Sequence, residues 1–396
     1  MEKNLVGRRG ILAGTAAAAA VGALAMAPGA HAANTAAGEI PAPKNMPLAF
    51  NADGKFKIVQ FNDTQDGRLT DRRTIELMEK VLDTEKPGFV VINGDVINGS
   101  PRTAQEVKEA YNNVVLPMET RGIKWAVTFG NHDEDSLDKN TGMREEEIVA
   151  FLQQYKHNLN PSPIKGVYGH SNAQFLIRSA SKNTAAFGVW LLDSNRYAPD
   201  TLGGQNFDGL MGYDWIRPNQ IDWYQEMSKA TEQKFGKKVQ SLMFFHIPTF
   251  EHHHMWFGQQ FSSNESGVAA AKIKHSIEGV KNEGVYTGAF NSGIYAAAQE
   301  RGDVRGMYCG HDHINTYKGD YFGIELGYAP GTGFGTYGLG GAQNHTLRGA
   351  RVFELDESAK NVYTGTRNIF AKDLGIDITP GNQRIAAPAE FPSYVK

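Results

Sequence analysis

The sequence Gly130-Asn131-His132-Asp133 directly follows an apolar run at 125–129. A strand that ends in an amide, an imidazole and a carboxylate is a poor way to close a hydrophobic core, because each group needs a polar partner once it is buried. The same three groups are well suited to hold a metal ion and a substrate. This stretch therefore predicts a functional site at the end of a strand.

Four other apolar runs of strand length also end in polar clusters. They are Asp63-Thr64-Gln65-Asp66 after 56–61, Gly94-Asp95-Val96-Ile97-Asn98 after 89–92, His246 after 242–245, and Gly310-His311-Asp312-His313 after 304–309. If the sheets that contain these strands stack in register, all five clusters converge on one edge. The pattern predicts a two-metal hydrolase.

The order of the expected elements indicates a layered α/β domain. Strands at 55–61, 89–92 and 125–129 alternate with amphipathic helices at 72–82 and 103–116. A second set of elements comprises helices at 143–155 and 219–231 and strands at 175–178, 187–192, 242–245, 304–309, 323–328, 351–354 and 362–367. We predict an export signal at 1–32, a linker at 33–50, one catalytic domain at 51–370 and an irregular tail at 371–396.

The N-terminal segment has the features of an export signal. Lys3, Arg8 and Arg9 precede a weakly apolar run, and Ala30-His31-Ala32 fits a cleavage pattern. The arginine pair resembles a twin-arginine signal, which would make the twin-arginine export machinery a partner and place the protein outside the cytoplasm, secreted or in the cell envelope. An ordinary secretory signal or a membrane anchor is the alternative, although the run at 11–27 is short and rich in Ala and Gly for a bilayer span. We expect no membrane span in the mature chain.

The net charge argues against a protein that coats nucleic acid, and the cysteine content excludes a fold held by internal disulfides. Removing residues 1–32 takes away three basic residues and one acidic residue, so the formal charge changes from −3 to −5. This balance argues against a surface that coats nucleic acid. The single cysteine, Cys309, rules out an intramolecular disulfide, so a core and bound metals must hold the exported fold.

The ligand set predicts two metal ions, divalent or mixed-valent, drawn from Mn, Fe, Zn or Ca. Two cations about 3.5–4 Å apart need a bridging carboxylate, and Asp95 is our candidate because Gly94 before it lets the backbone turn sharply. We assign the remaining ligands as Asp63 and His313 on one metal and Asn131, His246 and His311 on the other. This mixture of imidazole and oxygen donors suits transition metals.

Two residues of the first stretch are candidates for catalysis. His132 lies beside the ligand Asn131 and could protonate the leaving oxygen or hold the phosphate, with a purely structural hydrogen bond as the alternative. Asp133 is the expected partner that fixes the tautomer of His132. We therefore predict His132 and Asp133 as catalytic residues and Asn131 and His132 as phosphate contacts.

Three residues further along the chain are candidates for substrate binding. Arg68 could clamp phosphate, although a lone arginine in a loop is more often solvated. His253, in a run of three histidines, could lie at the mouth of the site, but a solvated loop or adventitious metal binding would give the same run. In the glycine-rich stretch 333–338, Phe334 and Tyr337 could stack on a substrate; the stretch does not open a dinucleotide-binding unit.

Taken together, the ordered motifs resemble the calcineurin-like metallophosphoesterase superfamily. The stretches 244–248, 310–315 and 348–352 are most similar to the branch related to purple acid phosphatases. Any one of these motifs is weak, but five in order at strand ends are specific. The resemblance implies a four-layer sandwich, with two stacked mixed β-sheets flanked by α-helices. It also implies a dinuclear site whose metal-bridging hydroxide attacks phosphorus in line.

The chain departs from the family pattern at two positions. Most members carry His two residues after the first Asp, whereas this chain has Gln65, whose amide oxygen is a weaker ligand. Either Gln65 still binds the first metal, or Asp66 helps, or that metal is held loosely. Coloured members place Tyr where this chain has Asn98, so we expect no tyrosinate charge-transfer band.

These observations predict an exported metal-dependent phosphoesterase that acts on a small phosphate ester. A phosphodiesterase acting on nucleotides or glycerophosphodiesters is an alternative, because monoester and diester hydrolysis use the same metal core. A protein that binds a phosphate ligand with one metal site impaired by Gln65 is another.

Overall fold

The computed structural model describes residues 39–206, 212–258 and 267–396, all of them in one compact unit. The predicted export signal at 1–32 lies outside the described residues. Within the described part of the chain, no helix combines the length and the apolar character that crossing a membrane requires.

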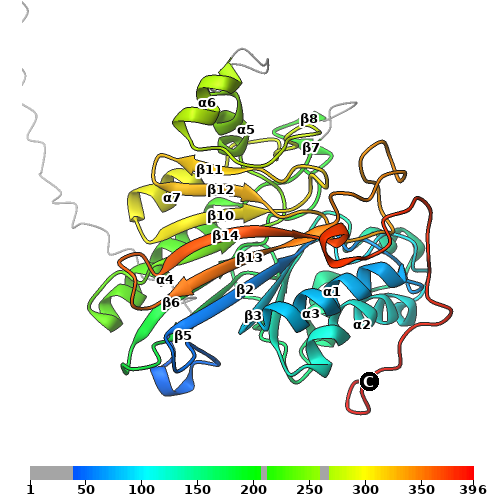
Figure 1. Cartoon of the computed structure of the whole chain (residues 1–396), viewed down its shortest axis with the longest axis horizontal. Helices are drawn as coiled ribbons and strands as arrows, with labels where there is room; N and C mark the ends of the chain where they lie inside the picture. The colour runs from blue at the N-terminus through cyan, green and yellow to red at the C-terminus, as the bar shows by residue number, and fades with distance from the viewer. Residues whose placement is uncertain (1–38, 207–211, 259–266) are drawn as a thin grey trace, which may run out of the picture. The chain divides into compact units, whose positions relative to one another are not determined.

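A five-stranded mixed sheet carries the N-terminal half of the site. Its order is β14-β13-β2-β3-β4, with β2, β3 and β4 parallel and β13 antiparallel to both neighbours. Figure 1 shows β14, β13, β2 and β3 side by side. The strands are β2 (Lys55–Phe61), β3 (Phe89–Asn93), β4 (Lys124–Thr128), β13 (Gly349–Asp356) and β14 (Tyr363–Phe370). Because β2, β3 and β4 are parallel, the polar clusters that follow them lie at the same edge.

A seven-stranded mixed sheet carries the other half. Its order is β1-β5-β6-β9-β10-β12-β11, with β6, β9, β10 and β12 parallel. The strands are β1 (Leu48–Ala49), β5 (Ala173–Arg178), β6 (Ala185–Leu191), β9 (Ser241–Phe244), β10 (Val304–Cys309), β11 (Lys318–Tyr321) and β12 (Ile324–Tyr328). A separate hairpin pairs β7 (Thr201–Leu202) with β8 (Gln205–Asn206).

The two sheets stack through a buried apolar layer. Successive side chains of a strand point to opposite faces, so Ile58 and Phe89 face the seven-stranded sheet, whereas Val59 and Val90 face a helical layer. Strands buried on both faces explain the continuous apolar runs in the sequence.

Helices cover the outer faces of both sheets. The helices α1 (Arg72–Glu85), α2 (Ala104–Thr120) and α3 (Glu145–Leu152) share a core with the five-stranded sheet. The helices α4 (Pro218–Phe235), α5 (Phe250–Phe257) and α7 (Ile294–Arg301) share a core with the seven-stranded sheet, and α6 (Val268–Lys274) packs on α5. This arrangement confirms the predicted four-layer sandwich of two mixed sheets flanked by helices.

Both ends of the described chain pack onto the domain. The segment predicted as a linker contains the 3-10 helix η1 (Pro43–Asn45) and strand β1, and the side chains of Ile40 and Met46 are buried. The tail begins with the 3-10 helix η4 (Ala371–Leu374) and then contains no helix or strand. Buried Arg73 holds this tail by donating to the carbonyl oxygens of Thr379 and Gly381.

Candidate metal centre

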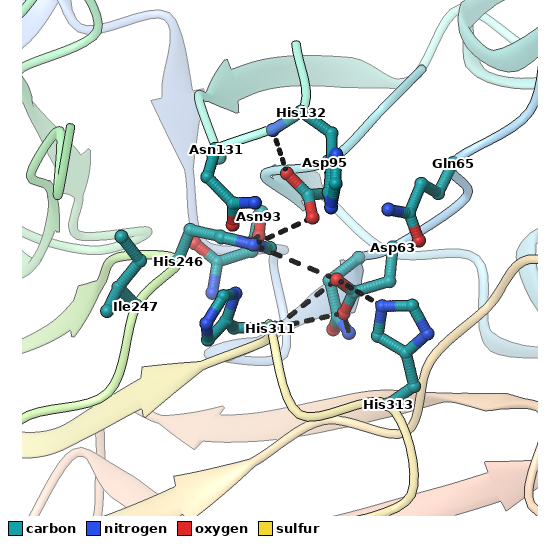
Figure 2. A network of polar contacts seen from close by, with 12 residues as sticks. Asp63, Gln65, Asn93, Asp95, Asn131, His132, His246, Ile247, His311 and His313 are labelled. Atoms are coloured by element: carbon teal, nitrogen blue, oxygen red, sulfur yellow. Dashed lines mark hydrogen bonds and ion pairs between the residues drawn. The ribbon is translucent and has the colours of Figure 1, made fainter. Parts of the chain in front are cut away.

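The predicted ligands meet where strands of both sheets end. Three of them come from the five-stranded sheet, where Asp63 follows β2, Asp95 follows β3 and Asn131 follows β4. From the seven-stranded sheet, His246 follows β9, and His311 and His313 follow β10. Figure 2 shows the side chains of Asp63, Asp95 and the three histidines gathered around one space.

Unusual backbone geometry turns several of these side chains toward one another. Asp63, Asp95 and His311 have φ angles of 51°, 50° and 71°, and Gln65 has a φ of 38°. Residues other than glycine rarely adopt this left-handed region, and such strain persists where the surrounding structure holds it in place for function. The strained positions coincide with the candidate ligands.

Two glycines make room for this arrangement. A Cβ atom on Gly94 would lie 2.4 Å from Nδ1 of His246, and Gly94 itself has a φ of 86°. A Cβ atom on Gly130 would lie 2.3 Å from Oδ1 of Asp95. Both glycines are therefore required by close approach to a ligand side chain.

The candidate donors fall into two groups that share one carboxylate. We call Asp63, Asp95 and His313 the first ligand group and Asp95, His246 and His311 the second ligand group; within each, one donor atom per residue lies within 4.8 Å of the others. His313 Nε2 lies 3.3 Å from Asp63 Oδ1, and His246 Nε2 lies 3.2 Å from Asp95 Oδ2. The shared Asp95 has the placement that a bridging carboxylate requires.

The second ligand group also contains buried polar atoms without a hydrogen bond. These are Nε2 of His246, Nε2 of His311 and Oδ1 of the adjacent Asn131. Buried polar atoms are normally satisfied, so the unsatisfied atoms of His311 and Asn131 fit a metal ion, whereas Nε2 of His246 already faces Asp95 Oδ2. His246 donates from Nδ1 to the Asn93 carbonyl at 2.9 Å, which leaves Nε2 as the ligand atom.

The two imidazoles of the second group differ in their electrostatics. Burial lowers the pKa of His246, but the neighbouring Asp95 and Asp63 outweigh burial and raise the pKa to about 10. Burial and the neighbouring His246 lower the pKa of His311 to about 3, against the smaller effect of Asp95 and Asp63. His311 therefore offers a free lone pair, whereas His246 must give up a proton before it can bind a cation.

Gln65 lies at the first ligand group but is already engaged. Its Oε1 accepts a hydrogen bond of 2.7 Å from the Thr336 hydroxyl. The two oxygens of Asp66, the alternative donor at this position, accept from the backbone amides of Gly67 and Asp71, and Asp66 belongs to neither ligand group. Asn98 donates to the Gln65 carbonyl at 3.3 Å.

A cleft of about 110 Å³ opens over the two groups. Its lining residues are Gln65, Asp95, His132, Tyr213, Tyr286, His311, His313 and Tyr337. Tyr337 stacks on His313 with ring centroids 4.0 Å apart, and Tyr213 meets His311 edge-on at 4.4 Å. Tyr337 thus lines the cleft, whereas the expectation that Phe334 faces substrate is wrong, because Phe334 is buried in the helical core beneath Arg73.

His132 lines the cleft, but its partner is not the one expected. Asp133 accepts from the backbone amides of Asp95 and Gly130 and from the Tyr111 hydroxyl, so its carboxylate stabilises the turn. The ring of His132 donates from Nδ1 to Asp135 at 2.5 Å. Burial lowers the pKa of His132, but Asp135 and Asp95 raise it more, so the pKa lies above its ordinary value.

Two predicted substrate contacts lie away from the cleft lining. Arg68 pairs with Glu109 at 2.9 Å. His253 lies on α5, where its ring packs against Phe257 with centroids 4.6 Å apart. The run of three histidines forms part of a helix whose first histidine, His252, is fully buried. Neither Arg68 nor His253 is among the described residues that line the cleft.

Five residues that hold or line the site were not predicted from the sequence. They are Asp135, Arg196, Tyr197, Tyr213 and Tyr286. Asp135 had a local signal, because it lies three residues after His132 and a helical turn brings such a pair together. Arg196 and Tyr197 follow the polar run 193–195 at the end of β6, whereas Tyr213 lies beyond the hairpin β7-β8, so only the fold brings Tyr213 to the site.

The comparison with known families agrees with this geometry. A model described as calcineurin-like phosphoesterase matches residues 56–315, which contain every residue of both ligand groups. The chain belongs to the calcineurin-like phosphoesterase family. This membership confirms the predicted superfamily and the prediction of a phosphoester hydrolase.

Curated relatives support the purple acid phosphatase branch. The probable inactive purple acid phosphatase 29 of Arabidopsis thaliana is 27% identical over 344 residues, covering 79% of this chain and 80% of that protein. The probable inactive purple acid phosphatase 14 of the same plant is 28% identical, covering 74% of each chain. Phosphatase DCR2 of Saccharomyces cerevisiae is 32% identical over 80% of this chain, which spans 54% of that protein.

Solved structures overlap with most of the chain at low identity. A dimetal phosphatase from Danio rerio has a TM-score of 0.46 and 13% identity, covering 80% of this chain and 99% of its own. The GAP50 anchor in the inner membrane complex of Plasmodium has a TM-score of 0.42 and 11% identity, covering 80% and 89%. These values are too low to refine the family assignment.

Proposed function

We propose that this protein is an exported phosphoesterase that hydrolyses a small phosphate ester at a centre of two metal ions. The observation that carries the proposal is the pair of ligand groups sharing Asp95, with a buried nitrogen of His311 and a buried oxygen of Asn131 that no protein group satisfies. Structural ion pairs would not leave such atoms unsatisfied.

Each ligand group would hold one metal ion. The first metal ion would be bound by Asp63 and His313. The second would be bound by His246, His311 and Asn131, and Asp95 would bind both metal ions. The bound metals would supply Lewis-acid charge and the activation of water for attack on phosphorus.

The residues around the metals would orient the ester. The side-chain amide of Asn131, held by the Tyr197 hydroxyl at 3.1 Å, would fix one phosphate oxygen. His132 would donate a proton from Nε2 to the leaving oxygen, because Nδ1 is committed to Asp135. Tyr337 and Tyr213 would flank the ester group as walls of the cleft.

The N-terminal sequence supports export by the twin-arginine route. The pair Arg8-Arg9, the apolar run after it and Ala30-His31-Ala32 support a signal at 1–32. A fusion of these residues to a reporter should be exported, and changing Arg8 and Arg9 to Lys should stop export. Export that is insensitive to this change would assign the segment to the general secretory route.

A phosphate-binding protein with one impaired metal site is the second candidate. Two observations favour it. Gln65 stands where an imidazole is usual and its oxygen already accepts from Thr336, and two of the plant relatives are named probable inactive phosphatases. In this reading only the second ligand group would hold its metal firmly.

Metal analysis combined with hydrolysis separates the candidates. Purified protein would be loaded with Mn, Fe, Zn or Ca in turn, analysed for metal, and given p-nitrophenyl phosphate and bis-p-nitrophenyl phosphate. Two metals per chain with turnover support the phosphoesterase, and the preferred ester distinguishes a monoesterase from a phosphodiesterase. One metal without turnover of either ester would support the binding protein.

A further inference from the structure

A turn of the chain sets Asp135 against the ring of His132. The backbone N–H of Asp135 donates to the His132 carbonyl at 3.0 Å, so the two residues close one turn at the start of the 3-10 helix η2 (Asp135–Lys139). Asp135 Oδ2 then accepts from His132 Nδ1 at 2.5 Å. With Nδ1 occupied, Nε2 is the nitrogen left to meet a substrate.

Arg196 holds this turn from the loop that follows β6. Its Nη2 donates to the other carboxylate oxygen of Asp135 at 2.8 Å, its Nη1 to Glu134 at 3.0 Å and its Nε to the Asn131 carbonyl at 3.1 Å. A planar guanidinium has its donors in a fixed fork, so three acceptors in one turn are held in one geometry.

The next residue extends the same clamp to a metal ligand. The Tyr197 hydroxyl accepts from the Asn131 side-chain amide at 3.1 Å, while Arg196 binds the carbonyl of that same residue. Tyr197 in turn stacks on Tyr213, which lines the cleft. The loop after β6 therefore holds both the ligand Asn131 and the partner of His132.

We propose that Asp135 and Arg196 are the residues that position His132 for the reaction, the role that the family-motif aspartate Asp133 would otherwise be given. Asp135 fixes the ring and its tautomer, and Arg196 fixes Asp135. The inference rests on the proposed function, because His132 acts on a leaving group only if an ester is hydrolysed.

The structure separates this role from simple support of the turn. Arg196 has two carboxylate partners, but only Asp135 touches His132, whereas Glu134 accepts from the backbone amide of Glu145 at 2.7 Å. Loss of the Glu134 charge would weaken the hold on Arg196 without releasing the ring. Loss of Asp135 would release the ring itself.

Paired variants test the proposal. Asp135→Ala should lower kcat for phenyl phosphate by about 10–100-fold with KM within about twofold, the loss typical of a residue that orients a functional group. The loss should be smaller for p-nitrophenyl phosphate, whose leaving group needs less protonation. Asp138→Ala is the matched control, because Asp138 lies on the same 3-10 helix and is exposed.

A double variant distinguishes positioning from a general structural effect. In a His132→Ala background, Asp135→Ala should cost no further activity, because the ring it orients is gone. Arg196→Met should behave like Asp135→Ala, Arg196→Lys should recover part of the loss, and Glu134→Gln should lose least. Metal content should stay at the wild-type value in all of them.

Three outcomes decide between the claims. A full additional loss in the His132→Ala background, or equal losses for both leaving groups, would overturn the positioning role. Absence of turnover by the wild-type chain with every metal would overturn the proposed function instead. In that case the ¹⁵N spectrum of the His132 ring still tests whether Asp135 positions the ring. We expect a proton on Nδ1 in the wild type and a mixture of tautomers in Asp135→Ala. The same tautomer in both proteins would overturn the positioning role.

Discussion

The first ligand group contains one imidazole, His313, whereas the second contains His246 and His311. In the second group Nε2 of His311 and the oxygen of Asn131 have no hydrogen-bond partner, and Nε2 of His246 faces Asp95. In the first group the additional donor is Gln65, whose oxygen already accepts from Thr336. Two sites built around one shared carboxylate are therefore unequally supplied with donors.

This difference indicates that the two sites bind metal with different strength. A neutral imidazole is a better ligand for Mn, Fe or Zn than an amide oxygen that must first give up a hydrogen bond. We expect the second ligand group to fill at lower metal concentration and the first to fill last. Activity that depends on both metals would then follow the occupancy of the first group.

Removing the shared carboxylate should have the largest effect. Asp95→Asn takes one charged oxygen from each group, so both metals should be lost and turnover should fall by more than about 100-fold, the most that loss of an outer partner of a ligand usually costs. Metal analysis and hydrolysis of p-nitrophenyl phosphate measure the two effects, with exposed Asp138→Asn as the control. Wild-type turnover by Asp95→Asn would rule out a shared ligand.

Removing one imidazole from each group should separate the two sites. His313→Ala takes the sole imidazole of the first group, so metal content should fall to about one per chain. His311→Ala leaves His246 in place and should weaken the second site without emptying it. Calorimetric titration with Mn measures both, and His254→Ala on α5 serves as the control for adventitious binding. Metal loss in that control would assign part of the bound metal to α5.

Restoring the missing imidazole should make the two sites more alike. Gln65→His should strengthen metal binding at the first group by about tenfold, which corresponds to about 1.4 kcal/mol. Turnover at limiting metal should rise with it. Thr336→Val tests the same point from the other side, because it frees the oxygen of Gln65 without changing the donor. An unchanged affinity in Gln65→His would show that the residue at position 65 does not limit the first site.

The smallest expected effect is a loss of stability in acid, caused by a buried histidine outside the metal centre. Burial lowers the pKa of His252 to about 3 from its usual 6.5, in contrast to His246 beside its carboxylates. The unfolded chain then binds more protons between these values, so the free energy of unfolding decreases as the pH falls below 6.5, by at most about 1.4 kcal/mol for each pH unit. Urea unfolding at pH 7 and pH 6 should differ by under about 1 kcal/mol from this source. His252→Gln should reduce that difference in the free energy of unfolding. An unchanged difference between pH 7 and pH 6 would mean that another group is responsible.

Much of the fold could be predicted from the sequence because each central strand is buried on both faces. The runs at 55–61 and 304–309 coincide with β2 and β10. Strand β11 was missed because three of its four residues, in Lys318–Tyr321, are not fully buried and carry no apolar run. Helices α5 and α7 could not be predicted because their apolar faces are short, and a solvated loop was one of the alternatives for the histidine run in α5.

The ligands could be predicted from the sequence, but the groups that orient them could not. A strand-end motif shows which donors are present, and these donors lie together because parallel strands end at the same edge of the sheet. The motif does not show which nearby carboxylate contacts the His132 ring. Asp133 and Asp135 are both plausible partners for His132 by spacing, and the choice depends on the turn that directs Asp133 to the amides of Asp95 and Gly130.

Stepwise titration of the metal-free wild-type chain with Mn, followed by elemental analysis, tests the unequal pair of sites most directly. Two metals per chain should bind, one in a tight and one in a weaker step, and only the weaker step should be lost in His313→Ala. A single step with one metal, unchanged in His313→Ala, would contradict it.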